Sequence, residues 1–229
     1  MIGLRSKRLI TDSIIYIVLA VMVVIWLFPL VWMVLRAFDA NTSNITTSIF
    51  PKEFTMDNFK NLFGGADYDQ YPYGKWLVNT LIVATGSCII STLLVLMVSY
   101  ALSRLRFKAR KTLMNIALIL GLFPGFLSII TLYYIFKQVS FTIGDTEYTL
   151  TNNTFGLILV YSIGAGTGYY IVKGFFDTVP VAIDEAARID GATKNRIFWR
   201  MIIPLSKPII IYTILTAFIG PWCDFILAK

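Results

Sequence analysis

Side chains able to do chemistry are few in this sequence, and they form no catalytic group. Histidine is absent, which removes histidine-based metal sites and histidine-dependent catalytic triads. The two cysteines, Cys88 and Cys223, lie inside apolar runs and suit small apolar packing. An enzyme acting inside a membrane would need paired carboxylates, a metal cluster or an activated nucleophile. We therefore predict no catalytic residue, no metal site and no cofactor held by this chain.

Asp224 is the one acidic residue placed well inside an apolar segment. A carboxylate at membrane depth costs about 3 kcal/mol unless it faces water or a polar partner. One interpretation is that Asp224 lines a functional pathway. The other is that it lies near the membrane surface and is simply hydrated.

The composition indicates that the bilayer is the solvent for these residues. Apolar residues make up 57% of the chain and charged residues 14%, with a mean hydropathy of +0.72. A soluble domain carries charge on about a quarter of its positions. The net charge of +7 would fit a nucleic-acid partner, but the cations cluster in short segments between apolar runs, as membrane topology requires. We therefore expect no nucleic-acid binding.

Five apolar segments are long enough to cross a bilayer as helices, since about 20 residues span its core. The first is too long for the apolar part of a cleaved signal peptide. The sequence thus predicts an all-α, multi-spanning membrane protein, with residues 1–229 as a single transmembrane domain. The predicted spans are residues 13–35, 79–102, 112–136, 154–176 and 209–228.

The distribution of positive charge predicts the orientation of the spans. Most of the 20 lysines and arginines lie in the N-terminal tail, in the loop after the second span, and between the fourth and fifth spans. Short cytoplasmic loops carry such an excess. We therefore expect a cytoplasmic N-terminus, and a further returning span beyond Lys229.

The predicted outer segment, residues 36–78, is rich in aromatic side chains. Tyr73 and Trp76 lie next to the second span, where an interfacial aromatic belt is expected. The alternative is a docking surface for an external partner.

Residues 177–208 are predicted to form two short helices joined by a turn. Thr178 is the expected N-cap of the first helix, and an ion pair from Asp184 to Arg188 is expected within it. Gly191 is the expected helix-ending residue with positive φ. A second helix is expected from about 193 to 201, ending before Pro204. From these residues alone, the segment is either an amphipathic connection resting on lipid or a surface with small residues that another protein approaches closely.

This segment contains the run Glu185-Ala186-Ala187-Arg188-Ile189-Asp190-Gly191-Ala192, followed by Phe198, Ile203, Pro204, Leu205 and Pro208. On these residues it resembles the EAA loop of ATP-binding-cassette importer permeases. Further similarity lies in Pro51 to Thr55, Asn58-Phe59, Trp76, Asn79-Thr80, Tyr100-Ala101-Leu102-Ser103-Arg104 and Phe107-Lys108. The extended motif is similar to the carbohydrate branch, specifically to the maltose/maltodextrin-type second permease subunit.

The resemblance implies a type I importer permease in the bacterial cytoplasmic membrane that moves an oligosaccharide such as maltodextrin. It implies a cytoplasmic ATPase dimer that binds ATP and magnesium, a second homologous permease and an extracytoplasmic sugar-binding protein as partners. Glu185, Ala186, Ala187 and Gly191 would couple the chain to the ATPase, and Asp190 would support the turn.

Recognition of a sugar inside the membrane would use aromatic and hydroxyl-binding side chains. The candidates for the pathway are Tyr133, Tyr161, Trp222 and Asp224, with Asn115 and Tyr134 as further possibilities. Where the family often has Trp-Asn-Asp/Glu-Phe, this chain has Trp222-Cys223-Asp224-Phe225, which lacks the amide. Two alternatives stay open: a permease for a polyol, glycerol phosphate or other solute, and a non-transporting membrane scaffold.

Overall fold

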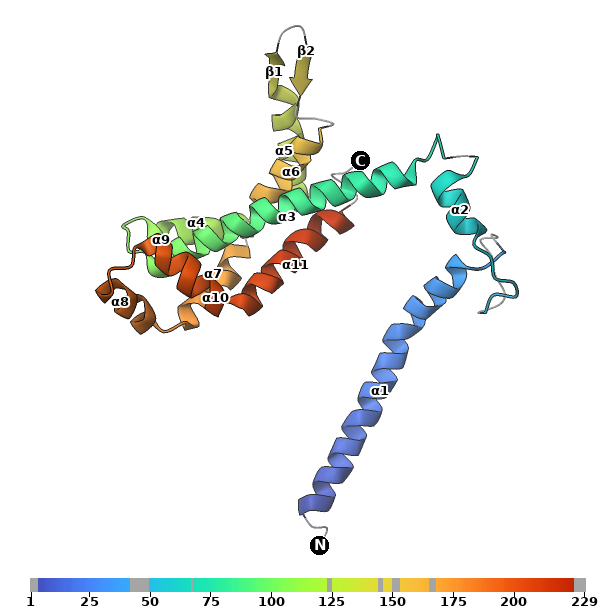
Figure 1. Ribbon diagram of the computed structural model, residues 1–229, viewed down its shortest axis with the longest axis horizontal. Helices are drawn as coiled ribbons and strands as arrows, with labels where there is room; N and C mark the ends of the chain where they lie inside the picture. Colours follow the sequence, from blue (N-terminus) through green and yellow to red (C-terminus); the bar gives the residue numbers. More distant parts are fainter. Residues whose placement is uncertain are drawn as a thin grey trace. The chain divides into compact units, whose positions relative to one another are not determined.

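The computed structural model describes residues 4–41, 50–66, 68–122, 125–143, 146–149, 153–164 and 168–224, and helices account for most of them (Figure 1). The chain divides into two compact units, Met1–Lys75 and Trp76–Lys229.

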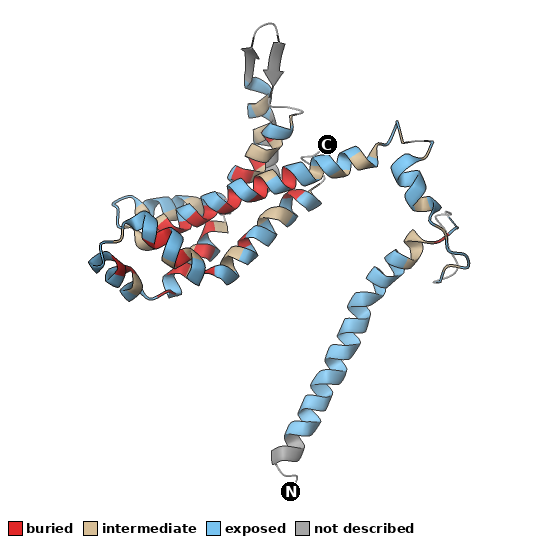
Figure 2. Ribbon diagram, in the orientation of Figure 1, coloured by how far each residue is buried: buried red, intermediate tan, exposed pale blue. Residues whose placement is uncertain are grey.

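The first unit contains helices α1 (Leu4–Ala37) and α2 (Asp57–Gly64). At 1.5 Å per residue, the 34 residues of α1 extend about 50 Å, more than the roughly 30 Å of a bilayer core. Its apolar surface is exposed (Figure 2), as expected of a helix that faces lipid. The helix includes the predicted first span.

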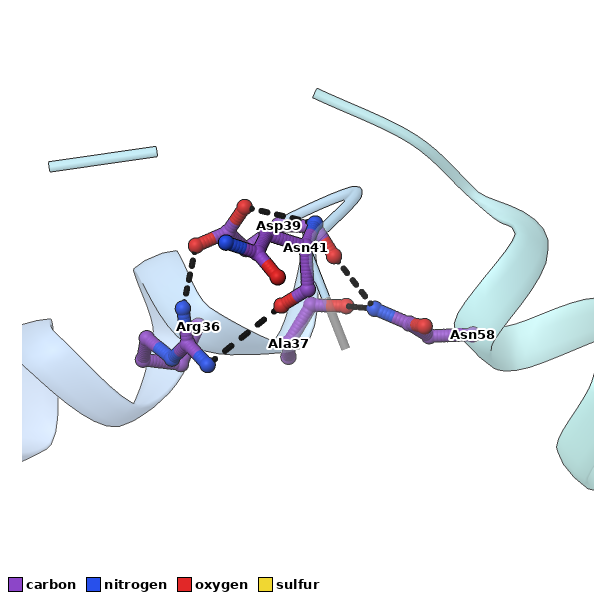
Figure 3. A network of polar contacts seen from close by, with 5 residues as sticks. All are labelled: Arg36, Ala37, Asp39, Asn41 and Asn58. Atoms are coloured by element: carbon purple, nitrogen blue, oxygen red, sulfur yellow. Dashed lines mark hydrogen bonds and ion pairs between the residues drawn. The ribbon is translucent and has the colours of Figure 1, made fainter. Parts of the chain in front are cut away.

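A polar network holds the end of α1 against the segment that leads into α2 (Figure 3). Arg36 pairs with the buried carboxylate of Asp39. The side-chain amide of Asn58 donates to the carbonyls of Ala37 at 3.1 Å and Asp39 at 2.9 Å. Phe59 packs on Phe38 with 5.2 Å between ring centroids. The Asn58-Phe59 pair noted in the sequence therefore orders this turn.

The second unit is built around α3 (Tyr73–Arg104), which lies beside α11 and the shorter helices of this unit (Figure 1). The other elements are α4 (Arg110–Gly121), α5 (Gly125–Gln138), α6 (Thr154–Gly164), α7 (Tyr169–Thr178), α8 (Val181–Ile189), α9 (Lys194–Ile197), the π-helix η2 (Phe198–Ile202), α10 (Ile203–Leu205) and α11 (Lys207–Cys223). Strands β1 (Ser140–Ile143) and β2 (Thr146–Thr149) form an antiparallel hairpin that pairs Ser140 with Thr149.

One face of α3 is buried along most of its length (Figure 2). The buried positions recur every three or four residues and many carry small side chains: Val83, Ala84, Ser87, Cys88, Ser91, Thr92, Val95, Leu96, Ser99 and Tyr100. Small residues let helices approach closely in a membrane. At Gly86 an added Cβ would lie 3.0 Å from the side chain of Ile158 in α6. The Cys88 thiol lies 3.4 Å from the carbonyl of Ile214 in α11.

The third and fourth predicted spans each cover two described helices, α4 with α5 and α6 with α7, and residues 123–124 and 165–167 between them lie outside the described residues. The fifth, predicted to end at residue 228, is described as helix to Cys223. It meets the helix before it at 86°. By length and composition, the described residues contain two helices able to cross a membrane, or three if that bent pair is one span.

The β1–β2 hairpin lies outside the predicted elements, in the connection between the third and fourth predicted spans. Its strands Ser140–Ile143 and Thr146–Thr149 are rich in β-branched and aromatic residues around Gly144-Asp145. That pattern is a hairpin signal.

Candidate functional site

The predicted turn in the 177–208 segment is confirmed at Gly191. Gly191 has φ of 75°, a left-handed conformation that favours glycine. Its N–H donates to the carbonyl of Arg188 at 3.0 Å, and the N–H of Ala192 donates to the carbonyl of Ala187 at 2.9 Å. This is a Schellman motif, which satisfies the last carbonyls of a helix. The end of α8 is therefore fixed by its own backbone.

The two faces of α8 differ in what they contact. Asp184 and Ala187 are its buried residues, each with 2% of its surface exposed. Ala187 packs into the main apolar cluster of this unit. On the other face Glu185, Ala186 and the 86%-exposed Ile189 contact solvent. Ile189 is thus an apolar side chain at the end of α8 that no other described part of the chain covers.

The five residues proposed for coupling therefore do not share one environment. Glu185, Ala186, Asp190 and Gly191 are exposed and lie within one helix turn and its cap. Ala187 is buried and serves packing within the chain.

Two predictions for α8 were wrong. Thr178 ends α7 and donates its hydroxyl back to the carbonyl of Phe175 at 2.7 Å, while Pro180 takes the N-cap position of α8. Asp184 faces inward and pairs with Arg104 at the end of α3, at 3.5 Å, instead of with Arg188. The ion pair expected along the helix surface is thus replaced by a buried contact with a distant segment.

The predicted second helix begins as expected and continues further. Thr193 caps it, accepting from the backbone N–H of Arg196 at 3.3 Å. The helix does not end before Pro204, because the π-helical turn η2 widens the backbone before α10 begins. A π-helical turn replaces the hydrogen-bonding pattern of an α-helix. Pro204, which has no N–H to donate, therefore interrupts this helix less than it would interrupt an α-helix.

The last turns of α3 contact the end of α7 and the start of the second helix of the 177–208 segment. Arg104 Nη2 donates to the carbonyls of Phe176, at 2.8 Å, and Val179, at 2.6 Å, at the end of α7. The hydroxyl of Tyr100 donates to the carbonyl of Lys194 in α9 at 3.2 Å, and its ring packs on Phe198.

Asp177 completes this contact between α3 and α7. It accepts from the hydroxyl of Ser103 at 2.6 Å and pairs with Lys173 one turn earlier. Burial alone would raise the pKa of Asp177, but the hydrogen bonds from Lys173 and Ser103 outweigh it and hold that pKa below its ordinary value.

The structure brings two of the four pathway candidates together. The carboxylate of Asp224, just after α11, lies close to the buried hydroxyl of Tyr161 in α6. Trp222 is 38% exposed and stacks on Phe218, with 5.5 Å between ring centroids. Tyr133 belongs to α5, but its side chain lies outside the described residues. Asn115 and Tyr134 are exposed on α4 and α5.

Sequence reasoning missed Arg104, the inward role of Asp184 and the exposure of Ile189. A signal for Arg104 was present, since it lies within the Tyr100–Arg104 run that supported the resemblance. The contact between Asp184 and Arg104 depends on the packing of α8 against α3, which local sequence does not specify.

Comparison with known proteins gives matches over most of the chain. The family described as binding-protein-dependent transport system inner membrane component matches residues 95–229. A galactooligosaccharides transport system permease protein, GanQ, from Bacillus subtilis (strain 168) is 36% identical over 99% of this chain and 76% of the relative. The maltodextrin transport system permease protein MalD of Streptococcus pneumoniae is 31% identical, with the same coverage of both chains.

A solved structure supports the fold. A chain of a bacterial ABC transporter involved in the import of the acidic polysaccharide alginate superposes with a TM-score of 0.66. The match covers 97% of this chain and 74% of the other, at 21% identity. At that identity the likeness concerns the architecture of the helices.

Proposed function

Because the chain belongs to the family of inner-membrane components of binding-protein-dependent transport systems, we propose that it moves a short neutral oligosaccharide, with maltodextrin as the first candidate. Its relatives are permeases for galactooligosaccharides and maltodextrin, and the chain is the permease subunit of a sugar importer. The proposal includes a cytoplasmic N-terminus, an ATPase dimer bound at the 177–208 segment, a second permease and an external sugar-binding protein.

The observation that carries this proposal is the construction of α8. Its inner face is fixed to the membrane helices through Asp184 and Ala187, and its outer face presents Glu185, Ala186 and Ile189. A helix built in this way can receive a partner on one side and move the spans on the other. A connection that rests on lipid has no need of a buried ion pair.

The proposed mechanism uses no chemistry in this chain. ATP binding closes the partner ATPase dimer, and α8 moves with the surface on which it docks. The spans then alternate between inward-open and outward-open states. Net import requires that ATP and the loaded binding protein stabilise these states differently.

Tyr161 and Asp224 are the proposed polar contacts for the sugar along the pathway. Their proximity supports this role, because a phenol and a carboxylate together can accept from and donate to sugar hydroxyls. A carboxylate there would repel an anionic solute such as glycerol phosphate. This favours a neutral sugar among the alternatives.

The proposed docking surface is tested at Ile189. We expect that Ile189→Asp, which places a charge on an apolar contact, lowers the amount of ATPase that co-purifies with the chain in mild detergent by about tenfold or more. Ile189→Leu, which keeps an apolar side chain, should retain the ATPase. Equal recovery of the ATPase with both variants would remove α8 from the interface and favour a scaffold whose partner binds elsewhere.

A further inference from the structure

We propose that Arg104 is a positioning residue that links α8 to α3, so that movement of α8 is carried along α3 to its opposite end. The inference rests on the proposed function, because it assumes that an ATPase moves α8. It concerns a residue for which sequence reasoning gave no role.

The geometry of Arg104 supports this link. The side chain is 4% exposed, and that of Asp184 is 3% exposed. Arg104 reaches α8 through Nε, which lies 3.5 Å from Asp184 Oδ2. Its Nη2 donates to the carbonyls of Phe176 and Val179, which end α7. One guanidinium therefore connects three helices, as its planar set of donors allows.

Asp184 depends on Arg104 for its charge partner. In the part of the chain that the structure describes, this contact is the one ion pair or hydrogen bond between a side chain of α8 and a membrane-spanning helix. Asp184 Oδ1 is buried and has no hydrogen-bond partner in the described residues. A buried charge that loses its partner is strongly disfavoured, so α8 and the end of α3 are expected to move together.

Tyr100 strengthens the connection from the other side of Gly191. Its hydroxyl donates to Lys194 in α9, and its ring packs on Phe198 in η2 at 4.8 Å between centroids. The last two turns of α3 thus contact both helices of the 177–208 segment. The turn at Gly191 and both its flanking helices are held to one element.

α3 is suited to carry movement further. Its 32 residues form one helix about 48 Å long, and within the described part of the second unit it is the one unbroken helix that passes the length and hydropathy criteria for a span. The helices Lys194–Leu205 and Lys207–Cys223, by contrast, are bent by 86° relative to each other. A rigid helix with a contact at one end transmits a displacement to the other.

The test compares the movement of α8 with that of α3 in the purified complex with its ATPase. Cysteines replace Ala182, exposed on α8, or Leu81, 46% exposed near the start of α3. The background carries Cys88→Ser and Cys223→Ser, and serine keeps a donor toward Ile214. Each cysteine takes a spin label, and its response to ATP with vanadate is recorded by electron paramagnetic resonance. In the wild-type background both labels should respond.

In Arg104→Ala we expect the label on α8 to respond as before, and the response of the label on α3 to fall by about tenfold. Arg104→Lys should restore part of it by returning a positive charge to Asp184. Arg106→Ala is the matched control, because Arg106 lies two residues further on and is exposed. A full response of α3 in Arg104→Ala would overturn the proposal. A purely structural role would instead weaken both labels together.

Two further outcomes also test the proposed link between α8 and α3. If Arg104→Ala does not reach the membrane, Asp184→Asn takes its place, since it removes the charge at nearly unchanged volume. An undiminished response of α3 in that variant would overturn the link. If the label on α8 is insensitive to ATP in the wild-type background, the proposed function fails, and the link falls with it.

Discussion

At the scale of single residues, Gly191 sets the geometry on which the proposed docking at α8 depends. Its φ of 75° ends the helix, and an added Cβ would meet no atom of the chain within 4 Å. Substitution there is therefore opposed by backbone strain rather than by crowding within the chain. Asparagine adopts the left-handed conformation far more readily than β-branched residues do.

We predict that Gly191→Asn and Gly191→Val have different effects. Gly191→Asn should keep at least about half of the transport rate, because the turn survives. Gly191→Val should lower it by about tenfold or more, since a β-branched residue is strained at this φ. Uptake measured in cells, with membrane content checked by immunoblot, tests this. Loss of uptake in both variants, with normal insertion, would show that a partner approaches Gly191 too closely for any side chain.

At the scale of elements, α3 organises the second unit through small side chains on one face. Ser87, Ser91 and Ser99 are buried along it, and Gly86 allows α6 to come close. The long apolar run and its charged ends were enough to predict this helix. Its role as the central helix could not be predicted, because hydropathy does not show which face a membrane helix turns toward its neighbours.

The close approach at Gly86 gives a matched pair of substitutions. We predict that Gly86→Leu destabilises the protein by about 1–3 kcal/mol, because its side chain would overlap Ile158. Gly174→Leu should be neutral or stabilising, since no atom lies within 4 Å of a Cβ at that helical position. Thermal unfolding in detergent measures both. A smaller loss of stability for Gly86→Leu than for Gly174→Leu would contradict the packing of α6 on α3.

Hydropathy also limits what can be predicted of the spans. Continuous apolar runs predict the third and fourth spans, but hydropathy cannot tell one long helix from two short ones. The bend before α11 was partly visible from Pro204 and Pro208, whereas the π-turn that precedes it has no local signal in the sequence.

At the scale of the whole molecule, the resemblance read from residues 185–192 is confirmed by the family match over residues 95–229. The turn at Gly191 was predictable, because its motif is local. The Arg104–Asp184 contact was not, because the two residues lie far apart in the chain and meet only after α8 packs on α3. Orientation, the sugar and the coupling residues stay predictions.

The most direct test of the account is ATP-driven uptake by the reconstituted complex. The chain is purified from the native membrane with the proposed ATPase and second permease and placed in liposomes that contain ATP. Labelled maltotriose and the sugar-binding protein are added outside. We predict that maltotriose accumulates with ATP and does not accumulate with a non-hydrolysable analogue. A complex that hydrolyses ATP yet accumulates neither maltotriose nor a galactooligosaccharide would contradict the account.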